Sequence, residues 1–458
     1  MPLLFPPVLS VPLLSVTLIS VAPEARAVPA PQTAETGAAE IRVTLTEALQ
    51  RAHTASARLA QLRALETASG ETLRGAQADR WPSLGLSGQY SRNSNVPEFV
   101  VPQPDGSQLV VFPNLPNQGY LRASVAQPLY TGGRVGGNLE SAEAQQAAAA
   151  QDTKAAQADL RLEVTASFWN LRSRRESERV LREAIASYEA HLKDATNLLE
   201  VGMAARNDVL AVQVERDGAE LSRLQAESAA EVENANLVRL LDLPPGSRVV
   251  PAEDAVDPGL GTEGRDLAEV EGFVAEALQQ RSEVLALQSR VAAASAQAKV
   301  ARAPSLPQAS LQGMYDYANP SQRIFPLEGT WRDTWTVAVG VSFTPFDGGR
   351  SSAAAARAEA QAEAAGHQLR DLQQRVRLEV TSRFLELRAA RASLEVATRN
   401  VTAAQENVRV SQDRYRAGVS PSSYLLDAET RLLHVDLERT QAAAHLQVAR
   451  ARLERARG

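Results

Sequence analysis

Arg161-Leu162-Glu163-Val164-Thr165 recurs as Arg377-Leu378-Glu379-Val380-Thr381, so one five-residue stretch is written twice, 377 − 161 = 216 positions apart. The same offset carries Gly202 onto Gly418. Chance similarity between two alanine-rich helices would not keep glycines at fixed positions. We therefore interpret the chain as an internal duplication, in which each half forms a similar structural unit.

Further upstream the halves match at a second offset, because Pro82 corresponds to Pro307 at 307 − 82 = 225. The loop between the two matching stretches has therefore changed length. Each half reads as helix, strand, loop, strand, long helix, turn and helix. In the first half a helix is expected over 44–80, where Thr46 precedes an amphipathic run that is broken before Pro82.

Each half also contains a long segment without proline, at 133–201 and at 349–416. At ~1.5 Å per residue such a helix would be roughly 100 Å long, which no single globular domain accommodates. Apolar residues repeat every seven positions in both segments: Val164, Leu171, Ile185, Leu192 and Leu199, then Val380, Leu387, Leu394, Val401, Val408 and Tyr415. Because only Glu178 interrupts this period, we expect coiled-coil helices with a left-handed supercoil.

Four segments of about ten residues alternate between apolar and polar side chains. They lie at 83–92, 120–129, 308–317 and 333–344. A period of two is typical of strands with one apolar face, and about ten residues is the length of a tilted membrane strand. A soluble sheet would show the same alternation, so the pattern alone leaves both interpretations open.

The surroundings of these segments favour a membrane. The connecting loops at 93–119 and 318–332 are rich in Pro, Asn and Ser, and Tyr317, Trp331 and Trp335 lie near strand ends, where aromatic rings prefer the membrane interface.

Four strands leave unpaired edges that hydrocarbon cannot satisfy, so other copies of the chain must close the sheet. Two copies would give a filled eight-stranded barrel, whereas three leave a lumen. We expect a mostly α chain with a small transmembrane β part: long coiled-coil helices forming an α-helical barrel, and four β-strands per chain contributing to a shared 12-stranded trimeric β-barrel.

The composition argues against several other classes of protein. The formal net charge is −6 without a basic patch, so no nucleic-acid partner is expected. There is no cysteine, which excludes disulfides, thiolate metal sites and a lipid anchor on cysteine. The dispersed histidines fit no metal-binding spacing and are interpreted as solvated surface residues: His53, His191, His367, His434 and His445. No glycine-rich phosphate loop follows a strand, so we expect neither an enzyme nor a cofactor or metal.

The beginning of the chain reads as an export signal. It is apolar from Leu3 to Ala22 and closes with Ala25-Arg26-Ala27, a small-x-small arrangement that signal peptidase accepts. No Lys or Arg precedes the apolar run, so a transmembrane anchor is the alternative. We expect a signal peptide over 1–27 with cleavage after Ala27.

Two stretches resemble the Pro-aromatic-Asp-Gly-Gly-Arg turn of the TolC-like outer-membrane factors, the exit ducts of efflux pumps and type I secretion. They are Gln-Pro-Leu-Tyr-Thr-Gly-Gly-Arg at 127–134 and Thr-Pro-Phe-Asp-Gly-Gly-Arg at 344–350. Proline would end the strand ladder, and paired glycines would permit a sharp turn into the long helix. The resemblance covers about 44–457 and marks the strand-to-helix turns at Pro128, Gly132, Gly133, Pro345, Gly348 and Gly349.

A second resemblance lies where each long helix ends, with a glycine followed by an Asp-Val-Leu-x-Ala type of segment. In this family these tips meet a periplasmic adaptor and constrict the aperture. The resemblance implies adaptor contacts at Val201, Gly202, Met203, Ala417, Gly418 and Val419, and aperture residues at Asp208, Tyr424 and Asp427. Some members carry Asp at the position of Tyr424 and Arg at that of Ser420, which argues against a charge-paired latch here. The alternative role of the two aspartates is to cap or solvate a helix start.

The resemblance also implies a domain layout. It comprises a periplasmic segment at 28–43, a first repeat at 44–241 with long helices at 133–201 and 207–241, an irregular equatorial linker at 242–271, and a second repeat at 272–457 with long helices at 349–416 and 422–457.

The function implied is a passive exit duct in the cell outer membrane, opened at its periplasmic tips. Its partners would be two further copies in a homotrimer, a periplasmic adaptor (membrane fusion protein), an inner-membrane pump and outer-membrane lipid. The alternative is a soluble exported coiled-coil adaptor or scaffold protein of the periplasm. That alternative does not explain strand pairs at matching places in both repeats.

Overall fold

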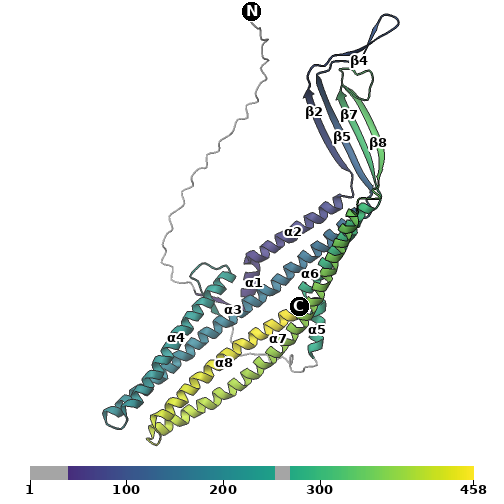
Figure 1. The fold of residues 1–458 in the computed structure, drawn as a ribbon. Coiled ribbons are helices and arrows are strands. Elements are labelled where there is room, and N and C mark those ends of the chain that lie inside the picture. Colours follow the sequence, from purple (N-terminus) through teal and green to yellow (C-terminus); the bar gives the residue numbers. More distant parts are fainter. Residues whose placement is uncertain (1–39, 253–268) are drawn as a thin grey trace, which may run out of the picture. The chain divides into compact units, whose positions relative to one another are not determined.

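The structure is a computed structural model that describes residues 40–252 and 269–458 (Figure 1). The expected signal peptide at 1–27 lies outside the described residues. The helices are α1 (Leu45–Ala55), α2 (Ala57–Ala78), α3 (Arg134–Glu200), α4 (Arg206–Leu240), α5 (Glu269–Gln280), α6 (Ser282–Arg302), α7 (Arg350–Arg416) and α8 (Ser422–Arg457), with a 3-10 turn at Ala303–Ser305. The strands are β1 (Glu40–Val43), β2 (Ser83–Arg92), β3 (Phe99–Pro102), β4 (Gln108–Phe112), β5 (Asn117–Tyr130), β6 (Arg248–Pro251), β7 (Gln308–Asn319) and β8 (Arg332–Ser342).

The two halves of the chain follow one plan. In the first half α2 leads to β2, β5, α3 and α4, and in the second α6 leads to β7, β8, α7 and α8. The long helices α3 and α7 both contain 67 residues. We call α3 with α4 the first hairpin and α7 with α8 the second hairpin.

The start of the first helix differs from the expectation. Thr44, not Thr46, caps it: the Thr44 hydroxyl accepts from the Glu47 N–H (3.2 Å), and the Glu47 carboxylate accepts from the Thr44 N–H (2.9 Å). The helix expected over 44–80 is also two helices, because Ser56 is extended and its hydroxyl caps α2.

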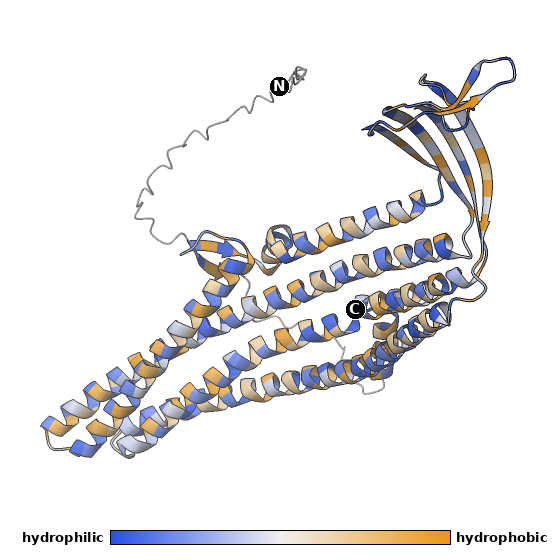
Figure 2. Ribbon diagram, turned by 45° about the horizontal axis from the view of Figure 1, so that its top comes forward, coloured by the Kyte–Doolittle hydropathy of each residue, from blue (hydrophilic) through white to orange (hydrophobic). Residues whose placement is uncertain are grey.

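Strands β2, β5, β7 and β8 form one antiparallel sheet in the order β2-β5-β7-β8. The register places Tyr315 beside Ala123 on one side and Trp335 on the other, so all three side chains share a face. On this face Leu86, Trp335 and other apolar residues are exposed, and Figure 2 shows apolar and polar bands alternating along the strands. The opposite face carries an ion pair between Arg122 and Asp316 at 2.5 Å.

Two segments expected to be irregular contain further strands. Within 93–119, β3 and β4 form an antiparallel hairpin. Within 242–271, β6 pairs in parallel with β1, and α5 already begins at Glu269. Residues 253–268 of the expected linker lie outside the described part of the chain.

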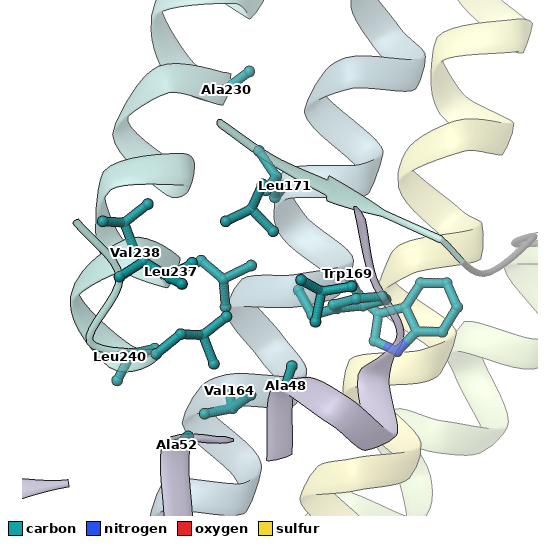
Figure 3. Packing of buried hydrophobic residues seen from close by; sticks show 14 of the residues in the cluster. Ala48, Ala52, Val164, Trp169, Leu171, Ala230, Leu237, Val238 and Leu240 are labelled. Carbon is teal, nitrogen blue, oxygen red and sulfur yellow. The ribbon is translucent and has the colours of Figure 1, made fainter. Parts of the chain in front are cut away.

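The long helices pack on one another along their length. α3 contacts α2, α4, α6 and α8, and α7 contacts α6 and α8. The largest buried cluster joins α1, α3 and α4, and it includes Trp169 and Leu171 of α3 and Leu237 of α4 (Figure 3). Small residues permit close approach: a Cβ at Gly137 of α3 would lie 2.7 Å from Val300 Cγ2 of α6.

Among residues 40–252 and 269–458, no helix combines the length and apolar character needed to cross a membrane.

Candidate functional site

The strand-to-helix turns require glycine in both repeats. Gly132 and Gly133 have φ of 60° and 91°, and Gly348 and Gly349 have φ of 72° and 86°. These left-handed conformations are accessible to glycine without the steric cost that a Cβ imposes. The two turns therefore share one backbone geometry, with which α3 and α7 begin.

The residue before each glycine pair caps the helix that follows. Thr131 Oγ1 accepts from the Val135 N–H at 3.2 Å. At the matching position, 131 + 216 = 347, the Asp347 carboxylate accepts from the Ser351 N–H at 2.8 Å and also from the Ser351 hydroxyl. The hydroxyl and then the N–H of Ser351 hold the pKa of Asp347 below its usual value, because both bonds favour the charged carboxylate.

The two prolines of these turns differ in position. Pro345 lies beyond the end of β8, whereas Pro128 lies within β5. The expectation that Pro128 ends its strand is wrong: β5 continues to Tyr130, and its register against β7 shifts between Pro128 and Tyr130. This register shift accommodates Pro128, which has no N–H to donate to the hydrogen bonds between β5 and β7.

Both long helices end in the same hydrogen-bonded motif. The N–H groups of Gly202 and Met203 donate to Leu199 O (3.0 Å) and Leu198 O (2.7 Å). In the second hairpin Gly418 and Val419 donate in the same way, to Tyr415 O (2.9 Å) and Arg414 O (3.1 Å). These are Schellman caps with glycine at a positive φ.

The tips also present apolar side chains to solvent. Val201, Met203 and Val419 are each more than two-thirds exposed.

The expected aperture residues lie in the first two turns of α4 and α8. Asp208 is half-buried and its carboxylate accepts from the Ala205 N–H at 3.3 Å, so it caps α4. Tyr424 and Asp427 are exposed on α8. No hydrogen bond or ion pair described in this region joins Asp208 to either of them. A role at an aperture stays a prediction for all three.

A buried polar cluster, which the sequence interpretation missed, joins the two hairpins above the tips. We call it the His191 cluster: Ser187, Tyr188 and His191 of α3 with Ser422, Glu429 and Thr430 of α8. His191 Nδ1 lies 2.9 Å from Glu429 Oε2, and its Nε2 lies 2.9 Å from the Ser422 hydroxyl. Ser187 donates to Glu429 at 2.9 Å, and Tyr188 to Thr430 at 3.1 Å.

His191 is only 3% exposed, so its interpretation as a solvated surface residue is wrong. The Tyr415 ring of α7 packs edge-on against it, with ring centroids 5.3 Å apart. A signal was present in the sequence: Ala184, Tyr188, His191 and Ala195 follow the four-three-four spacing of a coiled-coil seam.

Within the described ranges, no group of three or more His, Cys, Asp or Glu side chains could hold a metal ion. The His191 cluster is thus a hydrogen-bonded contact between helices.

The fold combines long duplicated helical hairpins, glycine turns from strand to helix, and a four-stranded sheet with an exposed apolar face. Together these features define a class of membrane-associated duct subunits. The chain belongs to the outer membrane efflux protein family, whose sequence profile matches residues 46–242 and 273–458.

Individual relatives and structures agree with this assignment. The chain is 28% identical to protein CyaE of Bordetella pertussis over 333 residues, which cover 71% of this chain and 68% of that protein. It is 24% identical to the outer membrane efflux protein BepC of Brucella suis, covering 93% of this chain and 88% of BepC. The outer membrane protein VceC of Vibrio cholerae has the same fold, with a TM-score of 0.75 and 18% identity over 90% of this chain and 96% of VceC.

Family membership confirms the mostly helical fold with a small strand part, the TolC-like resemblance and the outer-membrane location. The family is one of outer-membrane channels and not of enzymes. Membership of this family does not favour the alternative function, a soluble exported adaptor or scaffold protein.

Proposed function

We propose that three copies of the chain form one passive duct, which crosses the outer membrane and serves as the exit of a tripartite efflux pump or type I secretion system. Export by the signal peptide at 1–27 is part of this proposal. Selection and energy would come from an inner-membrane pump, joined to the duct through a periplasmic adaptor.

The sheet supports closure by further copies. β2 and β8 are its two edges, so each has one unpaired side. In hydrocarbon these free backbone groups need partners, and β8 of one copy can supply them to β2 of the next. Three copies would give 3 × 4 = 12 strands, enough for a lumen.

The observation that carries the proposal is an exposed apolar stripe on α4. At the offset of 216, Leu210 and Val232 of α4 correspond to Leu426 and Val448 of α8. The α8 residues are 9% and 5% exposed in the chain, in which α8 packs on α3. Their α4 counterparts are 50% and 67% exposed.

A complementary stripe lies on α7, the counterpart of α3. Leu385 and Val396 of α7 are 39% and 45% exposed, whereas the matching Trp169 and Val180 of α3 are 6% and 5% exposed. In a single chain, the duplication therefore leaves two apolar stripes exposed, one on α4 and one on α7. The contact that α3 makes with α8 within one chain would be repeated by α7 with α4 of the next copy, which closes a ring.

The tips support the remaining parts of the proposal. Exposed apolar residues Val201, Met203 and Val419 form a surface that an adaptor can cover. Threefold symmetry would repeat Asp208 and Asp427 around the duct axis, and such carboxylates favour cations.

A matched pair of substitutions tests the assembly. Val232→Asp should leave the chain folded and membrane-associated but prevent trimers, because it places a charge in the between-copy contact. Val448→Asp, at the matching position, should unfold the helical part, because that side chain is already buried within one chain. Size-exclusion chromatography with light scattering in detergent, circular dichroism and conductance in planar bilayers are the measurements. Trimers of Val232→Asp with wild-type conductance would refute the proposed ring.

A further inference from the structure

The four-stranded sheet has a polar face opposite its exposed apolar face. Successive residues of a strand point to opposite faces, so the register of the four strands assigns every side chain to one of them. Most side chains on the polar face are small or uncharged, and they include Ser87, Ser124, Gln312, Thr334, Thr336 and Ala338. In the proposed trimer this polar face lines the lumen.

Charged side chains are rare within these strands. Arg92, Arg332 and Asp333 lie within two residues of a loop, at the ends of β2 and β8. Arg122 of β5 and Asp316 of β7 lie further inside their strands, and both project from the polar face. These two residues therefore dominate the charge of that face.

Arg122 and Asp316 form a tightly held pair. They stand directly opposite each other in the register, and Arg122 Nε donates to Asp316 Oδ1 at 2.5 Å. The guanidinium carbon of Arg122 also lies 5.1 Å from the centroid of the Tyr120 ring. The remaining members of this row, Ser87 and Thr334, are neutral. One positive and one negative charge thus leave the row without net charge.

The duplication shows that the fold does not require this pair. β2 pairs with β5 in the same register as β7 pairs with β8. Asp316 corresponds to Ser91 (316 − 225 = 91), and Arg122 corresponds to Ala338 (122 + 216 = 338). The matching strands therefore form with neutral residues at both positions. The pair is also partly open to solvent, with side chains 40% and 17% exposed, and such pairs contribute little to stability.

We infer that Asp316 cancels the charge of Arg122 in the wall of the proposed duct, so that the strand part of the lumen admits anionic and cationic solutes alike. The inference rests on the proposed trimer, in which threefold symmetry repeats the pair at one level. Without Asp316, three arginine charges would face one water-filled lumen and favour anions. Asp316 is then a specificity-determining residue, although it binds no solute itself.

A single thiol in the otherwise cysteine-free chain can report the potential at the wall. Gln312→Cys places it on the polar face of β7, and Leu311→Cys, one residue away, places it on the apolar face. The protein in lipid vesicles is labelled with a sulfonated and with a trimethylammonium methanethiosulfonate reagent. The ratio of the two rates, divided by the ratio for a free thiol, measures the local potential. Labelling is done in ~0.01 M salt, in which charges act over about 30 Å.

The expected shifts have opposite signs. In the Gln312→Cys background, Asp316→Asn should raise the ratio of anionic to cationic labelling about threefold or more, and Arg122→Gln should lower it by a similar factor. The two substitutions together should restore the original ratio, because the net charge is again zero. Asp333→Asn is the matched control: it removes a carboxylate from β8 on the apolar face and should leave the ratio unchanged. At ~1 M salt all the variants should agree.

The outcomes separate this inference from the proposed trimer. If Leu311→Cys is labelled as fast as Gln312→Cys in vesicles, the polar face does not line a lumen and the proposed duct fails. If only Gln312→Cys is labelled, but the two single charge variants leave the ratio unchanged or shift it in the same direction, the duct stands and the role of Asp316 is overturned. A general disturbance of the sheet cannot produce opposite shifts that cancel in the double variant.

Discussion

The two repeats have the same backbone conformation at their turns and helix ends. They differ in how far matching side chains are buried against neighbouring helices. Their strand-to-helix turns have glycine pairs with the same positive φ, and both long helices end in Schellman caps. Yet α8 is buried along a face that α4 leaves exposed. A left-handed residue or a helix end constrains every copy of a duplicated unit alike, whereas packing changes with the partner.

In the proposed trimer, this difference corresponds to contacts with other copies, which a single chain does not contain. Where one repeat buries an apolar position and the other exposes its counterpart, the proposed trimer would cover the exposed one. This distinguishes the stripe on α4 from ordinary scattered apolar residues, which carry no such counterpart.

The largest expected effect is at the strand-to-helix turns, because the two turns have the same backbone conformation but different neighbouring atoms. A Cβ at Gly132 would lie 2.8 Å from Ala303 O and 2.9 Å from Leu306 Cβ, whereas one at Gly348 would meet nothing within 4 Å. Gly132→Ala combines left-handed strain with overpacking and should cost about 4 kcal/mol of unfolding free energy. Gly348→Ala carries only the strain, about 1 kcal/mol. Thermal unfolding in detergent, followed by circular dichroism, measures both. Equal costs would show that the repeats do not differ here.

Acid should weaken the ion pairs that join Glu283 of α6 to Arg281 and to Arg455 of α8. Burial would raise the pKa of Glu283, but hydrogen bonds from Arg455 and Arg281 outweigh it and hold this pKa at about 2. At the offset of 225 the first repeat has Arg58, an exposed residue 3.8 Å from Asp159.

Because the folded pKa of Glu283 is depressed, its contribution to stability is complete above the unfolded pKa near 4.5 and is lost as pH falls toward 2. The loss is on the order of 3 kcal/mol. Melting temperatures between pH 6 and pH 2 should therefore fall more steeply for wild type than for Glu283→Gln, with Arg58→Gln as the control that keeps the wild-type slope. Parallel slopes for wild type and Glu283→Gln would contradict this assignment.

Much of the fold could be predicted from signals that lie within single segments of the sequence. The seven-residue period, the glycine pairs and the alternation of 333–344 act within one element, so they predict helices, turns and strands without knowledge of neighbours. The hairpin β3–β4 also had such a signal, since Asp105-Gly106 lies between two apolar runs, but it was hidden by the polar composition of 93–119.

Other features depend on contacts between distant parts of the chain. β1 pairs with β6 across some two hundred residues, and four residues of either strand carry too little pattern to reveal the pairing. The His191 cluster is similar, because a histidine is polar by type and its burial is decided by Glu429 and Ser422 on the other hairpin. For the same reason, the sequence did not decide whether Asp208 is an aperture residue or a helix cap. In the structure its carboxylate caps α4.

The hairpin tips should show the smallest effect and no difference between repeats. Gly202 and Gly418 have φ of 77° and 72°, and a Cβ at either would meet nothing within 4 Å. Replacement by alanine should therefore cost about 1 kcal/mol in each, from left-handed strain alone. Urea unfolding of the purified protein in detergent, followed by circular dichroism, gives both values. Asn replaces Gly with less strain, so Gly202→Asn and Gly418→Asn should recover part of each loss. A markedly larger cost at one tip would mean that this tip is held by a contact with another copy, and that the divergence between the repeats extends to their ends.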